Sequence, residues 1–384
     1  TTSRPRLAHT LFLVAVPVMI AEVLIGSHAR VNPASAFFQA SQRSGVSSLW
    51  GLLGWWLMIC SVLLLAYYSV VAGWTMAYVG KMDARILADA SAAMVGEHFA
   101  TFLSAPDVLL YWQSLFIVLT FGISALGIHR GLGVLFWFVV PLIMVVLAAL
   151  INFGLQHGDV AAAGRFLFST VSFDFTATSV LVAMGHAFFT LGIGVGVGVA
   201  FGGYAPEKIP IGRTVLAVAI LDTFVAIFAG VALFPLIFSN NLEPVMGPAL
   251  MFVSLPYAFS NMPDGETFGV LFFSLISFVT LASAVAIAEV AMSWLVQRTR
   301  LRRPVAALCL GALVWVLALA ASLSFNVWED FLWFGGLTLF QLLDVVTTEI
   351  MMPVAALLVA LFVGYAMRRE VLRVEMYRES NQFF

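Results

Sequence analysis

The chain has 384 residues, of which 62% are hydrophobic and only 10% are charged. Soluble domains carry about 25% charged residues. The composition therefore excludes a soluble globular protein and predicts an all-α polytopic membrane protein, because lipid cannot satisfy open backbone groups. A formal net charge of −2 gives no sign of a nucleic-acid partner. Cys60 and Cys309 both lie in apolar runs and provide no disulfide framework.

Nine apolar segments are long enough to cross a bilayer as helices, which takes about 20 residues each. In chain order they are residues 7–28, 50–79, 112–128, 132–153, 180–202, 214–238, 268–296, 305–324 and 342–367. Residues 1–6 are polar and lead directly into a full-length span, so no signal peptide is predicted. Between the spans, residues 80–111 are expected to carry a short outer helix. Residues 239–267 contain four prolines, which predict a helical outer lid broken into short pieces.

The basic residues indicate how the spans are oriented. Thirteen of the 18 lysines and arginines fall in alternate loops, beginning with the loop after the first span. Cytoplasmic loops carry the excess of basic residues. The C-terminus is therefore predicted to be cytoplasmic and, with nine spans, the N-terminus external. An external N-terminus without a signal peptide predicts that one further helix belongs before the first span.

Five acidic residues lie within the spans, where a charge costs at least about 2.5–3.5 kcal/mol on insertion scales. They are Glu22, Asp222, Glu289, Asp344 and Glu349. Asp344 and Glu289 lie near span ends, which favours simple exposure of both side chains to water. Asp222 has apolar neighbours on both sides in A-V-A-I-L-D-T-F-V-A-I. With Glu22, it is the strongest candidate for a group facing the bundle interior or an aqueous path.

Residues 185–203 hold seven glycines, with one at every second position from Gly192 to Gly198. Pairs spaced as GxxxG are typical of helix-packing surfaces, but a period of two scatters residues around a helix. A nucleotide loop does not fit, because the G-x-G-x-x-G spacing and the Walker lysine are both absent. The favoured interpretation is a broken span, which frees backbone carbonyls and helix ends for an ion or a substrate near the midplane. Thr190, just before these glycines, adds a hydroxyl group as a ligand.

Motifs from about residue 7 to 375, in order and without large gaps, resemble the neurotransmitter:sodium symporter family, whose fold is the LeuT type. The glycine-rich stretch G-H-A-F-F-T-L-G-I-G-V-G (185–196) is similar to the sixth helix of that family, which is broken, and this resemblance places the break near Leu191–Val197. Further motifs resemble its second, third, seventh, eighth and tenth helices and the outer loop before the eighth. They are P-V-M-I-A-E-V-L-I-G (17–26), A-Y-Y-S-V-V-A-G-W (66–74), D-T-F-V-A-I-F-A-G-V-A-L-F-P (222–235), F-V-T-L-A-S-A-V-A-I-A-E (278–289), L-L-D-V-V-T-T-E-I (342–350) and G-P-A-L-M-F-V-S-L-P-Y-A-F-S (247–260).

The resemblance implies two inverted-topology repeats, formed by family helices one to five and six to ten. The nine spans correspond to helices two to ten. Residues 7–179 are then the remainder of the first repeat, residues 180–367 the second repeat, and residues 368–384 a cytoplasmic tail. The family's first and eleventh helices have no counterpart, which keeps open a second interpretation: a truncated scaffold of the same family that does not transport.

The implied activity is sodium-coupled symport of an amino acid or a related small amine, by alternating access, across a bacterial inner membrane. Tyr68 corresponds to the tyrosine that binds the substrate carboxylate, and Phe189 to an aromatic lid over the substrate. The other implied substrate-binding positions are Leu64, Gly192, Val195, Ser283 and Ile287. Because Gly192 and Val195 are small, we expect a roomy pocket that suits a medium or large apolar amino acid.

The resemblance also implies ligands for one or two sodium ions. Thr190 and Asp222 correspond to the first sodium site. Asp222 stands where chloride-dependent members have asparagine, so chloride independence is predicted. Ser283 and the carbonyl of Val279 correspond to the second site. That site is in doubt, since Ala282 replaces a usual threonine.

Three residues have implied gating or structural roles. Asp344 corresponds to the acid of the outer gate, and Tyr67 neighbours the substrate tyrosine. Glu22 is expected to hydrogen-bond backbone opened by the break, because unwound backbone in a membrane needs partners.

No organic cofactor is implied, and the expected partners are an amino-acid substrate and the lipid bilayer, with the protein a monomer or a homodimer. An intramembrane enzyme is a weaker interpretation. The sequence around His28, His129 and His186 shows neither metal-ligand spacing nor a catalytic triad pattern.

Overall fold

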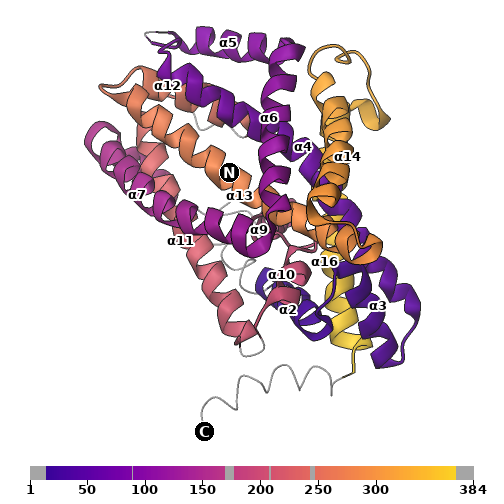
Figure 1. The fold of residues 1–384 in the computed structure, drawn as a ribbon. Helices are drawn as coiled ribbons and strands as arrows, with labels where there is room; N and C mark the ends of the chain where they lie inside the picture. The colour runs from indigo at the N-terminus through magenta and orange to yellow at the C-terminus, as the bar shows by residue number, and fades with distance from the viewer. Residues whose placement is uncertain (1–13, 89, 169–176, 207–208, 243–246, 369–384) are drawn as a thin grey trace.

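A computed structural model of the chain describes residues 14–368, apart from 89, 169–176, 207–208 and 243–246. The start of the first predicted span and residues 369–384 of the predicted tail therefore lie outside the described residues. Within the described part the secondary structure is helical throughout, which confirms the predicted all-α class. Figure 1 shows the helices gathered into one bundle.

The helices follow one another with short connections. In chain order they are α2 (Val16–Ala29), α3 (Pro33–Ser44), η2 (Ser48–Trp50), α4 (Gly51–Asp83), α5 (Ala92–Ser104), α6 (Pro106–Ala125), η3 (Ile128–Leu132), α7 (Gly133–His157), α8 (Val160–Phe168), α9 (Ala177–Leu191), α10 (Val197–Tyr204), α11 (Ile211–Ser239), η4 (Leu250–Ser254), α12 (Leu255–Ser260), α13 (Gly265–Thr299), α14 (Arg303–Leu323), η5 (Phe334–Gly336), α15 (Leu339–Asp344), η6 (Val345–Met351), α16 (Met352–Leu361) and η7 (Phe362–Ala366).

Seven helical segments among the described residues are long and apolar enough to cross a membrane. They are Ser48–Asp83, Pro106–Ala125, Ile128–His157, Ile211–Ser239, Gly265–Thr299, Arg303–Leu323 and Leu339–Ala366. Each corresponds to one predicted span. Of the two remaining spans, one is represented by the shorter apolar helix Val16–Ala29, and the other is divided into α9 and α10.

The connecting segments match the local signals in the sequence. Helix α5 is the short helix predicted within residues 80–111, and η4 with α12 forms the broken helical segment predicted within 239–267. Figure 1 shows α5 and α12 at one end of the bundle, and α3 with α10 toward the opposite end. Asn32 begins α3, because its side chain accepts the N–H of Ser35 (3.0 Å) just before a proline at the first helical position.

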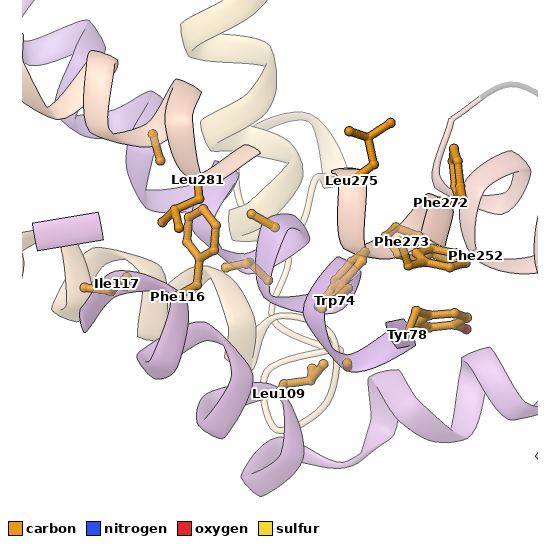
Figure 2. Packing of buried hydrophobic residues seen from close by; sticks show 14 of the residues in the cluster. Trp74, Tyr78, Leu109, Phe116, Ile117, Phe252, Phe272, Phe273, Leu275 and Leu281 are labelled. Atoms are coloured by element: carbon orange, nitrogen blue, oxygen red, sulfur yellow. The ribbon is translucent and has the colours of Figure 1, made fainter. Parts of the chain in front are cut away.

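Two apolar clusters fill the bundle. The first surrounds Trp74 and Tyr78 of α4 and includes Phe116, Phe252 and Phe273 (Figure 2). Its rings meet at centroid distances such as 5.2 Å between Tyr78 and Phe273, within the usual range for aromatic pairs.

The second cluster joins α2, α4, α10 and α16, and includes Leu57, Val199 and Met352. Ile287 on α13 and Phe340 on α15 pack against both clusters. The apolar residues of the broken helix, among them Leu191, Ile193 and Val195, belong to the second cluster.

Small residues let α10 approach α2 closely. A Cβ at Gly26 would overlap the carbonyl of Val199, and one at Gly202 would overlap the carbonyl of Val23. Small residues at such contacts are typical of membrane helix pairs. The packing interpretation of the glycine stretch therefore holds for its C-terminal end, beyond the break.

Candidate functional site

The predicted break in the 180–202 span is confirmed. Helix α9 ends at Leu191 and α10 begins at Val197. Between them Gly192, Gly194 and Gly196 have φ values of +65°, +81° and +85°. Only glycine adopts such values without strain. The period of two therefore arises because every second residue of the turn is left-handed.

Glu22 of α2 holds the middle of this turn. Its side chain is 0% exposed, and its Oε1 accepts a hydrogen bond from the N–H of Gly194 (2.8 Å). A Cβ at Gly198 would come within 2.8 Å of Glu22 Oε2, so the carboxylate also lies against the start of α10. The N–H of Gly194 has no partner within a helix because of the break, and Glu22 supplies the acceptor. A backbone donor buried away from water requires such a partner.

We expect Glu22→Ala to lower the free energy of unfolding by about 2 kcal/mol, because the buried Gly194 N–H would lose the side-chain oxygen that accepts its hydrogen bond. Glu22→Gln keeps a carbonyl oxygen and should cost less. The measurement is thermal unfolding of the purified protein.

A matched control for this prediction is Glu266→Gln. Glu266 pairs with the exposed Arg85 (3.1 Å) at the surface, where ion pairs contribute about 0–1 kcal/mol. Equal losses in Glu22→Ala and Glu266→Gln would contradict a structural role for Glu22.

The residues assigned to the substrate come from three helices, α4, α9 and α13, and from the turn at the break. Leu64 on α4 and Val195 in the turn belong to the second cluster, and Ile287 on α13 contacts both clusters. The hydroxyl group of Tyr68 faces the side chain of Ser283 on α13. Helices α4 and α13 pack against each other, so these residues share one region of the bundle.

The two phenylalanines before the break point in different directions. Phe188 is buried in the second cluster, whereas the side chain of Phe189 is 43% exposed. Gly192 opens the turn, and the nearest atoms to a Cβ placed there belong to Val197 at 3.8 Å. A Cβ at Gly192 would therefore make only ordinary van der Waals contacts.

Tyr67 and Asp344, assigned to gating, lie next to each other. Tyr67 packs edge-on against Phe340, with ring centroids 5.7 Å apart. Its hydroxyl group lies beside Asp344 and Thr347. Phe340 was not singled out from the sequence, because one more phenylalanine in an apolar helix carries no distinguishing signal.

The assigned ion ligands lie on α9, α11 and α13. The hydroxyl of Thr190 donates to the carbonyl of Ala187 (3.2 Å) in α9. Asp222 is half-buried on the neighbouring α11 and faces His186, one turn before Thr190. On α13, Val279 and Ser283 are half-buried and Ala282 is buried.

A buried polar network at the far end of α10 was missed by the sequence analysis. The carboxylate of Glu289, 2% exposed, accepts the hydroxyl of Tyr204 (2.8 Å) and forms a two-pronged ion pair with Arg303. Arg303 also donates from Nε to the carbonyl of Ser124 (3.0 Å). The prediction that Glu289 simply reaches water is wrong, because α13 continues to Thr299 and the other groups enclose the carboxylate.

Comparisons with known proteins agree with this geometry. The family model of the sodium:neurotransmitter symporter family matches residues 103–378. The uncharacterized sodium-dependent transporter YhdH of Bacillus subtilis is 30% identical over 369 residues, covering 96% of this chain and 81% of that protein. An uncharacterized sodium-dependent transporter of Haemophilus influenzae is 26% identical, covering 94% of this chain and 80% of that protein. The crystal structure of MhsT in complex with L-phenylalanine has a TM-score of 0.88 at 30% identity, covering 98% of this chain and 85% of MhsT.

Proposed function

Because the chain belongs to the sodium:neurotransmitter symporter family, we propose that it takes up an amino acid or a related small amine together with sodium ions. One central site is exposed alternately to the two sides of the membrane. The protein works in a bacterial inner membrane with its C-terminus in the cytoplasm. The excess of basic residues in alternate loops supports that orientation.

The observation that supports a central site is the open backbone of residues 192–196. A broken helix presents free carbonyls, and the ends of its halves carry partial charges near the midplane. The surrounding side chains suit two parts of an amino acid, its carboxylate and its side chain. The hydroxyl of Tyr68 suits a carboxylate, and Leu64, Val195 and Ile287 suit an apolar side chain.

The pocket suits a medium or large apolar amino acid. Gly192 contributes no side chain and Val195 a small one, so neither fills the space beside the break. MhsT, which shares the fold at 30% identity, was crystallised in complex with L-phenylalanine. Both points support an apolar amino acid of that size.

Ligand binding by the purified protein tests this proposal. We expect L-phenylalanine and L-leucine to bind more tightly than alanine or glycine. Replacing sodium with potassium should weaken their binding about tenfold or more, a usual size for coupling between two ligands. A series that peaks at glycine would contradict the pocket, and equal binding in the two salts would contradict coupling.

Asp222 supplies the fixed negative charge of the first sodium site, and uptake therefore does not depend on chloride. We expect Asp222→Asn to weaken sodium-dependent binding in chloride-free buffer about tenfold or more, because sodium loses a charged oxygen ligand. Adding chloride should partly restore binding to this variant and leave the parent protein unchanged.

Glu349→Gln is the matched control for Asp222→Asn. Glu349 is also an acid within a span, but its side chain is exposed and is assigned to no site. Chloride-stimulated binding in the parent protein would refute the role given to Asp222.

A further inference from the structure

A groove of about 440 Å³ runs between α4, α13 and α14, away from the broken helix. It is lined by apolar side chains, among them Ile59 and Val62 of α4, Trp294 of α13, and Cys309 and Leu313 of α14. Ile59 and Leu313 are each 50% exposed, so the groove opens to the outside of the bundle. Such a lining offers few partners to the hydrogen-bonding groups of a polar ligand or a peptide backbone, because only Trp294 and Cys309 carry side-chain hydrogen-bond donors.

One end of the groove leads to a basic loop. Residues 297–303 read Q-R-T-R-L-R-R and contain four arginines and no acid. Arg298 follows Trp294 by four residues in α13, so the two side chains share one face of that helix. Arg302 has an extended backbone and directly precedes α14, the helix that carries Cys309. Both arginines therefore lie at the ends of helices that line the groove.

These two arginines differ from their neighbour Arg303. Arg303 forms an ion pair with Glu289 and donates a hydrogen bond to the carbonyl of Ser124. Arg298 and Arg302 are exposed, and among the described residues neither has an ion-pair partner. Two cationic groups thus stand free at the mouth of an apolar groove.

An aromatic pair lies at the same end. Trp55 of α4 meets Trp294 edge-on, with ring centroids 4.9 Å apart, and Trp55 is 41% exposed. Tryptophan is enriched where the hydrocarbon of a bilayer meets its headgroups. The pair therefore indicates that this end of the groove lies at the depth where the acyl chains of the bilayer meet the phosphate groups.

We propose that this groove binds a phospholipid with an anionic headgroup, from the leaflet that faces the basic loop. One acyl chain lies along α4, α13 and α14, and the phosphate contacts Arg298 and Arg302. Basic pockets between spanning helices at the cytoplasmic side select anionic lipids in this way. The charge of the loop favours this ligand over a zwitterionic lipid of the same length.

Cys309 provides a reporter within the groove. It is a free, exposed cysteine that lines the cavity, whereas Cys60 is buried in the second cluster and serves as an internal control. The protein is placed in nanodiscs of phosphatidylcholine, with or without phosphatidylglycerol, and labelled with N-ethylmaleimide. We expect phosphatidylglycerol to slow labelling of Cys309 about fivefold, the effect of one arginine–phosphate attraction or more.

The double variant Arg298→Gln/Arg302→Gln should abolish this difference between the lipids. Arg165→Gln, which removes an exposed arginine outside the loop, should preserve it. Native mass spectrometry with phosphatidylglycerol and phosphatidylcholine at equal amounts provides a second readout, in which only the parent protein and Arg165→Gln retain the anionic lipid. Equal labelling with both lipids, or a difference that survives in the double variant, would overturn the proposal.

Discussion

Replacing Gly194 with alanine should lower the free energy of unfolding by about 3 kcal/mol or more and eliminate sodium-dependent binding. Gly194 has φ = +81°, a conformation that strains any residue with a Cβ. The added Cβ would also overlap the carbonyl oxygen of Met352 and stand 2.8 Å from its Cα. Both atoms belong to the backbone where η6 passes into α16, so no side chain can move aside.

Two other glycines of the same segment are matched controls. Gly192 has φ = +65°, but the nearest atoms to its Cβ position are 3.8 Å away. Gly192→Ala should therefore lower the free energy of unfolding only by the backbone strain, about 1 kcal/mol. Gly185 lies within α9 with open space around it, and Gly185→Ala should stabilise the helix by up to about 1 kcal/mol.

Thermal unfolding of the three variants separates the cost of backbone strain from the cost of steric overlap with the backbone of Met352. The expected order of stability is Gly185→Ala, then Gly192→Ala, then Gly194→Ala. If Gly194→Ala and Gly192→Ala unfolded at the same temperature, the close approach between the turn and α16 would not contribute.

The broken helix could be predicted because its cause is local. Glycine at alternate positions is unfavourable in a continuous helix and is favoured where the backbone takes left-handed conformations, as Gly192, Gly194 and Gly196 do. The spans could be predicted for a similar reason, because length and apolar composition decide which segments cross a membrane. The broken helical segment within residues 239–267 followed from the prolines and glycines there.

The Glu289–Arg303 pair could not be predicted, because it depends on how two helices cross. Glu289 lies ten residues before the end of α13, and Arg303 is the first residue of α14. In a simple antiparallel hairpin this offset would separate them by about 15 Å in depth. Figure 1 shows α13 running obliquely to α14, and that crossing brings the two side chains together. Side-chain volumes over the whole interface set such an angle, and no short motif encodes it.

Removing one partner of this pair is the second change expected to have a large effect. Arg303→Gln should lower the free energy of unfolding by about 3–5 kcal/mol, because it leaves the Glu289 carboxylate buried without a counter-charge. The double variant Glu289→Gln/Arg303→Gln removes both charges and should recover part of that loss. A double-mutant cycle with Glu289→Gln, read by thermal unfolding, gives the coupling between the two side chains.

The same network should also keep the C-terminal end of α10 packed against α13. Tyr204 ends α10, and its hydroxyl is tied through Glu289 to α13 and α14. Ser293 is 4% exposed and lines a small cavity with Tyr204 and Gln297, so a cysteine there reports opening on this side. In a Cys309→Ser background, Ser293→Cys should react faster with a thiol reagent when Arg303→Gln is present, and Arg165→Gln should leave its rate unchanged. If Arg303→Gln lowered stability without raising the labelling rate at temperatures below unfolding, the network would support the fold alone. An increase that sodium reverses would show that the ion pair opposes the same movement that releases the ion.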